Sequence, residues 1–238
     1  MLAIGAYEKC KRYIEQHSEE TSECLKKKEV FPCITISRQT GSGSYEVSER
    51  LIDILQKITR QPKNPWTYFN KELITKVIED FKLPKTLSNY LAENKYNHIS
   101  DAVNELLGVK PSEWTVVHKS IEIILQLARY GKTIIVGRGS NVITSKLPNC
   151  FHVRLVAPVE QRVEHVRAVL NYSKSEALAY IKREDTNRKK YLKSHFFREP
   201  EDPTLYHFII NTGNFSYYDS ALVIADALMK KFPKSFSE

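Results

Sequence analysis

The chain has 238 residues, of which 42% are hydrophobic and 27% are charged, values that suit one packed domain with or without an inserted segment. No apolar run approaches the roughly 18 residues needed to span a bilayer, so a membrane-spanning protein is excluded. The formal net charge of +8 indicates an anionic partner, and nucleic acid, nucleotides or a merely solvated basic surface would each satisfy it.

Residues 1–30 are expected to form an N-terminal helix followed by a polar linker. The opening stretch MLAIGAYEKCKRYIEQH carries charges between its apolar residues, which excludes a secretion signal and favours an amphipathic helix. Such a helix could dock a protein partner or a second copy of the chain. The four cysteines show no CxxC spacing, which indicates reduced thiols in a cytoplasmic protein and no metal site.

A strand followed by a helix is predicted next. FPCITIS, residues 31–37, is a short β-branched run typical of a strand buried on both faces. The helix is expected over 44–59. Its apolar residues fall on one face and are Val47, Leu51, Ile54, Leu55 and Ile58.

The middle of the chain is less regular. RQPKNP breaks the chain, WTYF reads as a short second strand, and a helix begins near Lys71. A helical insert is expected at about 84–118. A long helix over about 112–130 ends at Gly131.

Three further apolar runs predict strands in the second half: TIIVG, FHVRLVA and FIINT. Helices are expected near 158–170, 173–194 and 216–231. Strands that alternate with helices pair in parallel through right-handed crossovers, so the sequence predicts a three-layer α/β/α domain. Ligands of such sheets bind beyond the carboxyl ends of the strands, where RQTGSGS, NKEL, GRGSN, APVEQR and NTGNFS lie.

The glycine turn after the first strand has the layout of a phosphate-binding loop. Gly41 to Ser44 could turn backbone N–H groups toward an anion at a helix N-terminus. The pattern GxxxxGK[ST] is not met, because Ser44 replaces the lysine and Tyr45 the hydroxyl residue, while Arg38 stands at the first glycine. The alternative is a tight turn with glycines for clearance only. Without the lysine, phosphoryl transfer would need its positive charge from Arg38 or from basic residues elsewhere.

Six segments in order resemble the cytidylate kinase-like family: ISRQTGSGSYEVSERL, WTYFNKELITKVIED, IIVGRGSNVI, FHVRLVAPVEQRV, KREDTNRKKYLKSHF and YHFIINTGNFSYYDSA. The resemblance runs from about Pro32 to the last helix. It implies a P-loop NTPase fold over 31–238, with about five parallel strands, a helical insert and a basic lid at about 173–198. It also implies transfer of the γ-phosphate of ATP, with Mg²⁺, to CMP or a related small phosphoacceptor.

The resemblance also implies roles for individual residues. Arg138 and Gly139 would bind the acceptor, as would Asn70, which stands where the family usually has aspartate. Arg138 and the lid residues Arg183, Asp185 and Arg188 would be catalytic. Arg38 is a further catalytic candidate, because its charge could replace that of the missing loop lysine. The donor would contact Thr40, Gly41, Ser42, Gly43, Ser44 and Tyr45 through its phosphates, and Asn211, Thr212 and Gly213 beside adenine.

Each of these roles has a structural alternative. Asn70 could cap the helix that begins at Lys71. Asp185 and Arg188 could form an ordinary ion pair on a solvent-facing helix, and Arg138 could bridge strand ends. The same fold could therefore serve a nucleotide-binding regulator that transfers nothing. A nucleic-acid binder is the least favoured interpretation, because the basic residues cluster in the lid and do not alternate with aromatic residues.

Overall fold

The computed structural model describes residues 13, 31–59, 65–80 and 113–236. Its sheet has five parallel strands in the order β2-β3-β1-β4-β5, which confirms the predicted fold class. The strands are β1 (Cys33–Arg38), β2 (Thr67–Phe69), β3 (Thr133–Val136), β4 (Cys150–Val156) and β5 (Phe208–Asn211).

The central strand β1 is buried on both faces, as expected from its sequence. Its side chains alternate between the two faces, so that Ile34 and Ile36 belong to one buried cluster and Cys33 to another. Ile34 pairs with Ile134 of β3 and Phe151 of β4. A strand with neighbours on both sides and helices on both faces has no solvent-exposed surface, which accounts for its continuous apolar sequence.

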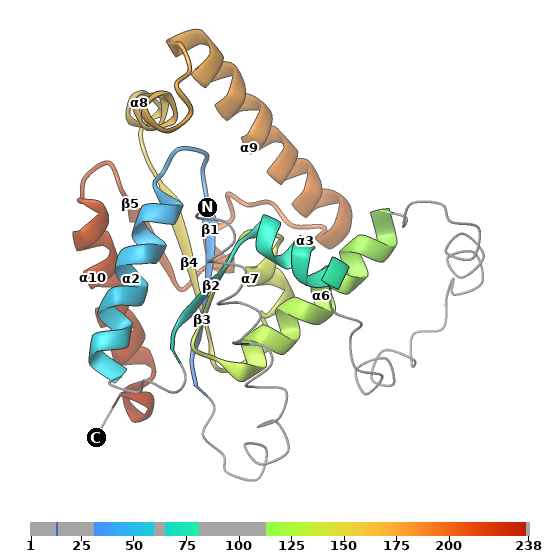
Figure 1. Ribbon diagram of the computed structural model, residues 1–238, viewed down its shortest axis with the longest axis vertical. Coiled ribbons are helices and arrows are strands. Elements are labelled where there is room, and N and C mark those ends of the chain that lie inside the picture. Colours follow the sequence, from blue (N-terminus) through green and yellow to red (C-terminus); the bar gives the residue numbers. More distant parts are fainter. Residues whose placement is uncertain (1–12, 14–30, 60–64, 81–112, 237–238) are drawn as a thin grey trace.

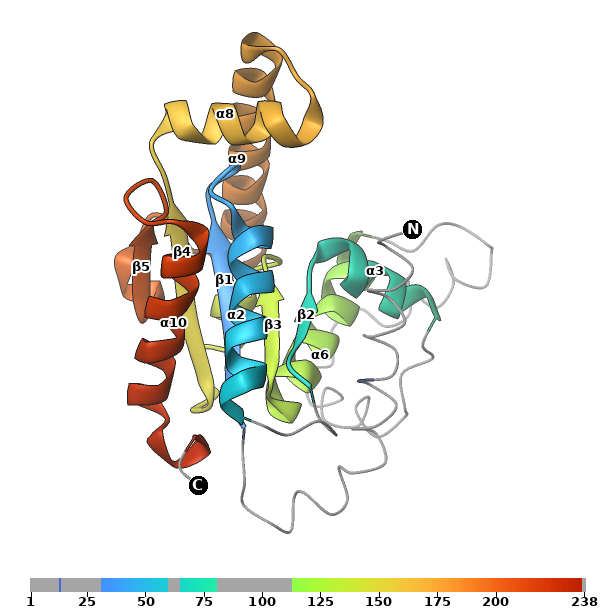
Figure 2. The same ribbon diagram turned by 60° about the vertical axis from the view of Figure 1, so that its left-hand side comes forward.

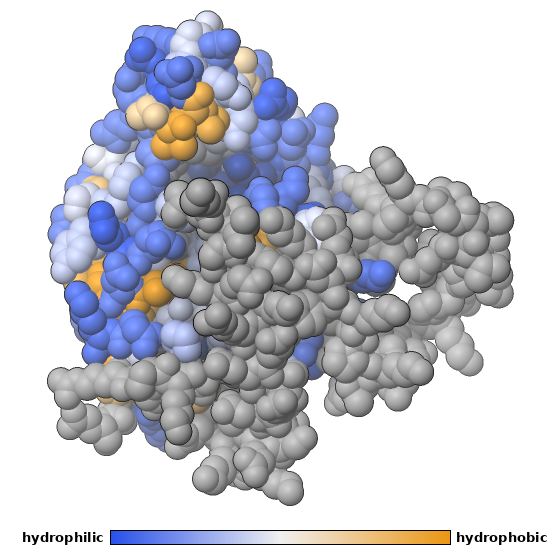
Figure 3. Space-filling model, in the orientation of Figure 1, coloured by the Kyte–Doolittle hydropathy of each residue, from blue (hydrophilic) through white to orange (hydrophobic). Residues whose placement is uncertain are grey.

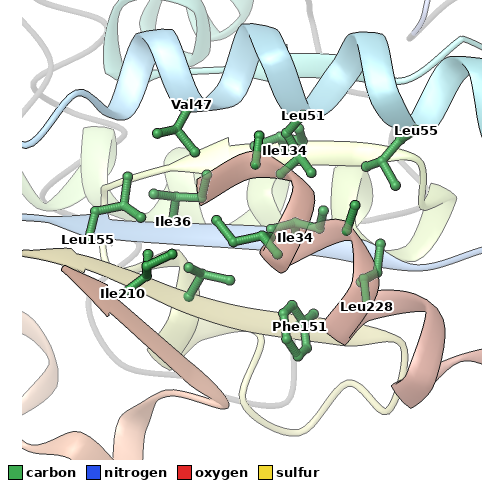
Figure 4. Close-up of a cluster of buried hydrophobic side chains, with 14 of the residues drawn as sticks. Ile34, Ile36, Val47, Leu51, Leu55, Ile134, Phe151, Leu155, Ile210 and Leu228 are labelled. Atoms are coloured by element: carbon green, nitrogen blue, oxygen red, sulfur yellow. The ribbon is translucent and has the colours of Figure 1, made fainter. Parts of the chain in front are cut away.

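One face of the sheet is covered by α2 (Ser44–Thr59) and α10 (Tyr217–Lys231), which lie side by side (Figures 1 and 2). Val47, Leu51 and Leu55 of α2 point from the helix toward the strands, and Leu228 approaches from α10 (Figure 4). Ile54 is only partly buried and Ile58 is 36% exposed, so the buried stripe of α2 is narrower than the apolar pattern predicted.

The opposite face is covered by α6 (Glu113–Tyr130), with the short helix α7 (Ser140–Ile143) and α3 (Lys71–Asp80) nearby. Ile123, Ile124 and Leu127 of α6 are buried in this layer. Tyr13 also belongs to it: its ring lies edge-on to Phe69 at 5.7 Å. These contacts complete the three layers.

Helices α8 (Val159–Leu170) and α9 (Lys174–Phe196) form an arm beyond the carboxyl ends of the strands (Figures 1 and 2). A capping box fixes the start of α9, because Ser173 accepts from the amide of Glu176 and Glu176 accepts in return from Ser173. The visible surface of the arm is mainly hydrophilic apart from one small apolar patch (Figure 3). The sequence predicted both helices within two residues of their observed ends.

The remaining predictions divide into two groups. Apart from Tyr13, the predicted N-terminal helix and linker at 1–30 lie outside the described residues, as does the insert at 84–118 up to residue 112. Helix α7 and two 3₁₀ turns at Pro203–Leu205 and Pro233–Ser235 were not predicted, since three or four residues are too short to show a period. Among the described helices, none combines the length and apolarity that a bilayer span requires.

Candidate functional site

A cavity of about 800 Å³ lies at the carboxyl ends of β1, β3 and β4, beside α9. This is where a parallel sheet of this kind binds its ligands. Six cationic side chains line the cavity: Arg38, Lys71, Arg138, Arg154, Arg188 and Lys190. Four carboxylates also line it: Glu72, Glu184, Asp185 and Glu201. The cavity wall therefore has an excess of positive charge and suits an anionic ligand.

The loop between β1 and α2 adjoins this cavity. It turns tightly, with the amide of Ser42 donating to the carbonyl of Gln39 at 3.3 Å. Gly41 has a φ of 82° and Gly43 a φ of 72°, conformations that glycine adopts without strain. The two glycines allow the chain to turn and enter α2 at Ser44.

Packing within the protein also requires these glycines. A Cβ added to Gly41 would lie 2.5 Å from the carbonyl oxygen of Arg162 in α8. A Cβ added to Gly43 would lie 2.1 Å from the ring of Tyr217 in α10. Both clearances are needed with or without a ligand, so the glycines alone do not establish phosphate binding.

The loop amides give more direct information. The Thr40 amide donates to Asp185 Oδ1 at 2.8 Å, so one loop N–H already holds a carboxylate of the lid helix. The described residues provide no acceptor for the amides of Gly41, Gly43 and Ser44. These amides lie at the N-terminus of α2, where the helix dipole favours negative charge. The loop can therefore hold phosphate oxygens.

Ser44 and Tyr45 do not reproduce the lysine and hydroxyl of the usual loop. Tyr45 is 52% exposed, and its ring lies edge-on to Tyr68 at 6.1 Å. Within the described ranges, no group of three His, Cys, Asp or Glu side chains could hold a metal ion. Magnesium often binds mainly through substrate phosphates and water, so a metal carried by ATP would fit this site without a protein cage.

Arg38 lies at the end of β1 and lines the cavity. Its guanidinium packs against Gly137, where an added Cβ would lie 2.1 Å from Nη1. Burial, with the nearby positive charge of Arg188, lowers the pKa of Arg38 to about 10, which still leaves it charged at neutral pH. Among the described residues, no side chain forms a hydrogen bond or an ion pair with this guanidinium. Arg38 therefore has no described salt bridge that would compete with a ligand.

Arg138 lies on a strained loop after β3. Three successive residues, Gly137, Arg138 and Gly139, have φ values of 85°, 57° and 69°. A left-handed arginine is unfavourable and persists only where its surroundings fix it, as at many functional sites. Arg138 Nη2 donates to Thr75 Oγ1 at 3.1 Å, while its buried Nε has no partner among the described residues.

Gly139 lies where the loop after β3 approaches the lid helix α9. A Cβ at this position would lie 2.7 Å from the ring of Phe196 in α9. A side chain at this position would require the Phe196 ring, or the helix that carries it, to shift. The absence of a side chain at Gly139 thus leaves room for α9 to pack closely against the loop after β3.

Asp185 connects α9 with the glycine loop. Its Oδ1 accepts from the amide and hydroxyl of Thr40, at 2.8 and 2.6 Å, and from Arg188 at 3.0 Å. Its Oδ2 accepts from Arg162 Nη1 of α8 at 2.6 Å. Burial by itself raises the pKa of Asp185, but the hydrogen bonds from Thr40 and Arg162 outweigh it, so the net pKa lies below its ordinary value. Arg188 also contacts the hydroxyl of Thr40 and is thereby held beside the loop.

Arg183 and Asn70, two of the predicted site residues, do not line the cavity. Arg183 has a 63% exposed side chain, which contacts Glu184 at 3.3 Å and lies over the ring of Tyr180. Asn70 Oδ1 accepts from the amide of Leu73 at 2.9 Å and so caps α3. Neither side chain lines the cavity.

The segment after β5 packs against the glycine loop between β1 and α2. Thr212 Oγ1 donates to the carbonyl of Ser42 at 3.0 Å and lies 3.3 Å from that of Val156. Asn211 Oδ1 accepts from the amide of Gly213 at 2.9 Å. None of the three lines the cavity of positive charge. They lie beside the glycine loop, which is compatible with the donor side to which the resemblance assigns them.

Two arginines of this site were not predicted. Arg154 in β4 is 7% exposed and lines the cavity, and Arg162 holds Asp185. The signal for Arg154 was present, since a charged residue in an otherwise apolar buried strand needs a partner. The partner of Arg162 lies 23 residues away on another helix, and sequence spacing does not reveal it.

Solved structures show where this architecture recurs. The crystal structure of an uncharacterized protein from Eubacterium ventriosum has a TM-score of 0.62 and 18% sequence identity, covering 83% of this chain and 98% of that one. A gluconokinase from Sinorhizobium meliloti has a TM-score of 0.45 and 10% identity, covering 88% and 100%. A shikimate kinase from Bacteroides thetaiotaomicron has a TM-score of 0.42 and 12% identity, covering 85% and 98%. Only the first structure has a TM-score above 0.5, and at 18% identity it shows a shared fold alone.

Among curated proteins, a uronate isomerase from Corynebacterium glutamicum is 23% identical over 100 residues. The matched stretch covers 42% of this chain but only 19% of that protein, so it says nothing about the activity of the whole isomerase.

The family comparison is more extensive. Residues 33–214 match the Cytidylate kinase-like family, and this range contains the glycine loop, the arginine loop after β3 and the lid helix. The match supports a phosphotransferase of the P-loop kind. Because it spans well over half of the sequence, the chain belongs to the cytidylate kinase-like family.

Proposed function

We propose that this protein transfers the γ-phosphate of ATP to CMP or a related small phosphoacceptor. The observation that carries the proposal is the group of arginines around one cavity beside a loop with unpartnered amides. Arg38 and Arg138 come from different parts of the fold, and neither forms an ion pair with a described carboxylate. Arginines so arranged suit phosphate groups, to which they bind through a planar fork.

In this proposal the residues divide the work by position. The amides of Gly41, Gly43 and Ser44 hold the donor phosphates, and Arg138 holds the acceptor phosphate. Arg188 lies beside Thr40 and reaches the transferred group. Arg38 supplies the positive charge that the missing lysine would give. Magnesium bound with ATP would neutralise further charge on the donor phosphates.

The test is magnesium-dependent ADP formation with a panel of nucleoside monophosphates and other small acceptors. Arg188→Ala should lower kcat by about 100-fold or more, since cations that contact the transferred phosphoryl group contribute on this scale. Arg167→Ala is the matched control, because Arg167 lies on the outer side of α8, paired with Glu164 at 3.0 Å. It should leave turnover unchanged.

Two substitutions of Arg38 distinguish the effect of its charge on turnover from its effect on stability. Arg38→Lys should retain measurable turnover, whereas Arg38→Met should abolish it while leaving thermal unfolding nearly unchanged. Wild-type turnover in Arg38→Met would remove Arg38 from the reaction.

Asp185 on the Thr40 amide favours one alternative, a nucleotide-binding regulator whose loop is partly occupied by its own lid. Thermal stabilisation by ATP without turnover on any acceptor would support this alternative. Absence of both turnover and stabilisation would exclude both functions.

A further inference from the structure

Arg154 is a buried cation whose neighbours are neutral. Its side chain leaves β4 beneath the cavity and is 7% exposed. Nη1 donates to Ser37 Oγ at 3.1 Å and to Tyr206 Oη at 3.3 Å, and the guanidinium lies 5.5 Å from the centre of the Tyr206 ring. No described carboxylate forms an ion pair with it. Arg162, buried to a similar degree, has Asp185 at 2.6 Å.

The rest of the Arg154 guanidinium faces the cavity. An arginine has five N–H donors, and the two contacts described use only those of Nη1. Within the described part of the chain, Nε and Nη2 make no hydrogen bond, yet neither is among the fully buried polar atoms without a partner. Both atoms therefore open onto the cavity that Arg154 lines. Nε and Nη2 form the edge that binds carboxylate or phosphate through two parallel hydrogen bonds.

Arg154 and Arg138 are held by different elements of the fold. Arg138 is bound to Thr75 on α3, which follows the edge strand β2. Arg154 is bound to Tyr206, which precedes the other edge strand, β5. Tyr206 is itself fixed, because its hydroxyl donates to the carbonyl of Pro200 at 2.9 Å. The two guanidinium groups are therefore fixed independently, each by its own hydrogen-bond partners.

We propose that Arg154 forms a second anion subsite, which binds a phosphate or carboxylate group of the acceptor other than the phosphate that receives the γ-phosphoryl group. The inference rests on the proposed function in taking the cavity as the acceptor site. It goes further by naming the substrate class: a small acceptor with two anionic groups, one at Arg138 and one at Arg154. An acceptor with a single phosphate leaves Arg154 buried without a counter-ion, which is unfavourable.

Calorimetric titration with two matched pairs of probes tests the subsite without any turnover. Cytidine 3′,5′-bisphosphate against CMP adds a phosphate, and 3-phosphoglycerate against glycerol 3-phosphate adds a carboxylate. The wild type should bind the doubly anionic member of at least one pair about 10- to 100-fold more tightly, the size expected of a charged hydrogen-bonded contact. The pair that shows the preference identifies phosphate or carboxylate as the ligand group.

Arg154→Gln should abolish this preference, and Arg154→Lys, which keeps the charge without the fork, should retain part of it. Arg167→Gln, a change of the same kind on the exposed side of α8, should keep it in full. Thermal unfolding of each variant confirms that it is folded. Crystals soaked in sodium tungstate should show an anion at Arg154 Nε and Nη2 in the wild type, and none there in Arg154→Gln.

Three results would overturn the proposal: no preference in either pair, a preference that persists in Arg154→Gln, or tungstate at Arg154 without any preference, which would be an adventitious ion only. Turnover is not a readout here, so the two proposals fail separately. An inactive protein that prefers a doubly anionic probe refutes the kinase reaction alone, and an active CMP kinase without the preference refutes the second subsite alone.

Discussion

Asp185→Asn is the most informative single change for the lid contact, because it removes one negative charge and keeps the shape of the side chain. The asparagine oxygen can still accept from the Thr40 amide and from Arg188, but its NH₂ group then faces the Arg162 Nη1 donor. Arg162, 9% exposed, loses its only described counter-ion. The variant therefore tests whether the carboxylate holds α8, α9 and the glycine loop together.

The expected cost follows from the burial of the pair. Removing one partner of a fully buried ion pair costs about 3–5 kcal/mol. The Arg162 side chain is 11% exposed and that of Asp185 is 31% exposed, so solvent reduces the cost to about 2–3 kcal/mol. For a domain of this size, that loss lowers Tm by roughly 5–10 °C.

The assay is thermal unfolding followed by circular dichroism, with Glu164→Gln as the control. Glu164 pairs with Arg167 at 3.0 Å, but both side chains are largely exposed, so this variant should lose less than about 0.5 kcal/mol. Because the pKa of Asp185 is lowered in the folded protein, its contribution is complete above the ordinary aspartate pKa near 4 and is lost as the pH falls through the folded value. The gap between wild type and Asp185→Asn should therefore close in acid. Equal Tm losses in the two variants at pH 7 would refute the assignment of a stabilising role to Asp185.

Three further outcomes follow from single sites. Burial, with the positive charges of His207 and Lys231, lowers the pKa of His152 to about 4, so up to about 3 kcal/mol of stability should be lost between pH 6.5 and 4; His152→Gln should flatten this part of a pH series of urea denaturations. Asn70→Ala should cost about 1 kcal/mol through loss of the α3 cap, whereas Asn70→Asp, which also caps, should retain the wild-type Tm. Gly41→Ala should cost more than about 1 kcal/mol in the same denaturation assay, because its φ of 82° and the nearby backbone carbonyl both oppose a side chain, and a neutral result would contradict the loop geometry.

The sequence predicted the elements well because their signals are local. Short apolar runs marked the five strands, and helical periodicity marked the longer helices. The strand order, β2-β3-β1-β4-β5, was not predicted and is known from the structure. Ile58 of α2 shows the limit, since an apolar residue at the edge of a helical stripe can remain exposed.

The site was less predictable because its contacts join distant parts of the chain. Arg138 and Asp185 fall within recognisable motifs, but nothing in their spacing shows that Asp185 bonds to Thr40, 145 residues away. Asn70 matched a site position of the family and is instead seen as a helix cap. Arg154 was read as part of a strand, and only three-dimensional packing shows its open side in the cavity.

If Arg38 takes the role of the missing loop lysine, as proposed, the choice of arginine has a physical consequence for the charge of the site. Burial beside Arg188 lowers the pKa of Arg38 from 12.5 to about 10, which still leaves the guanidinium charged at pH 7. A lysine begins near 10.4, and an equal shift would bring it to about 8, where roughly one molecule in ten is neutral. A buried arginine therefore keeps its positive charge in a position where a lysine would begin to lose it.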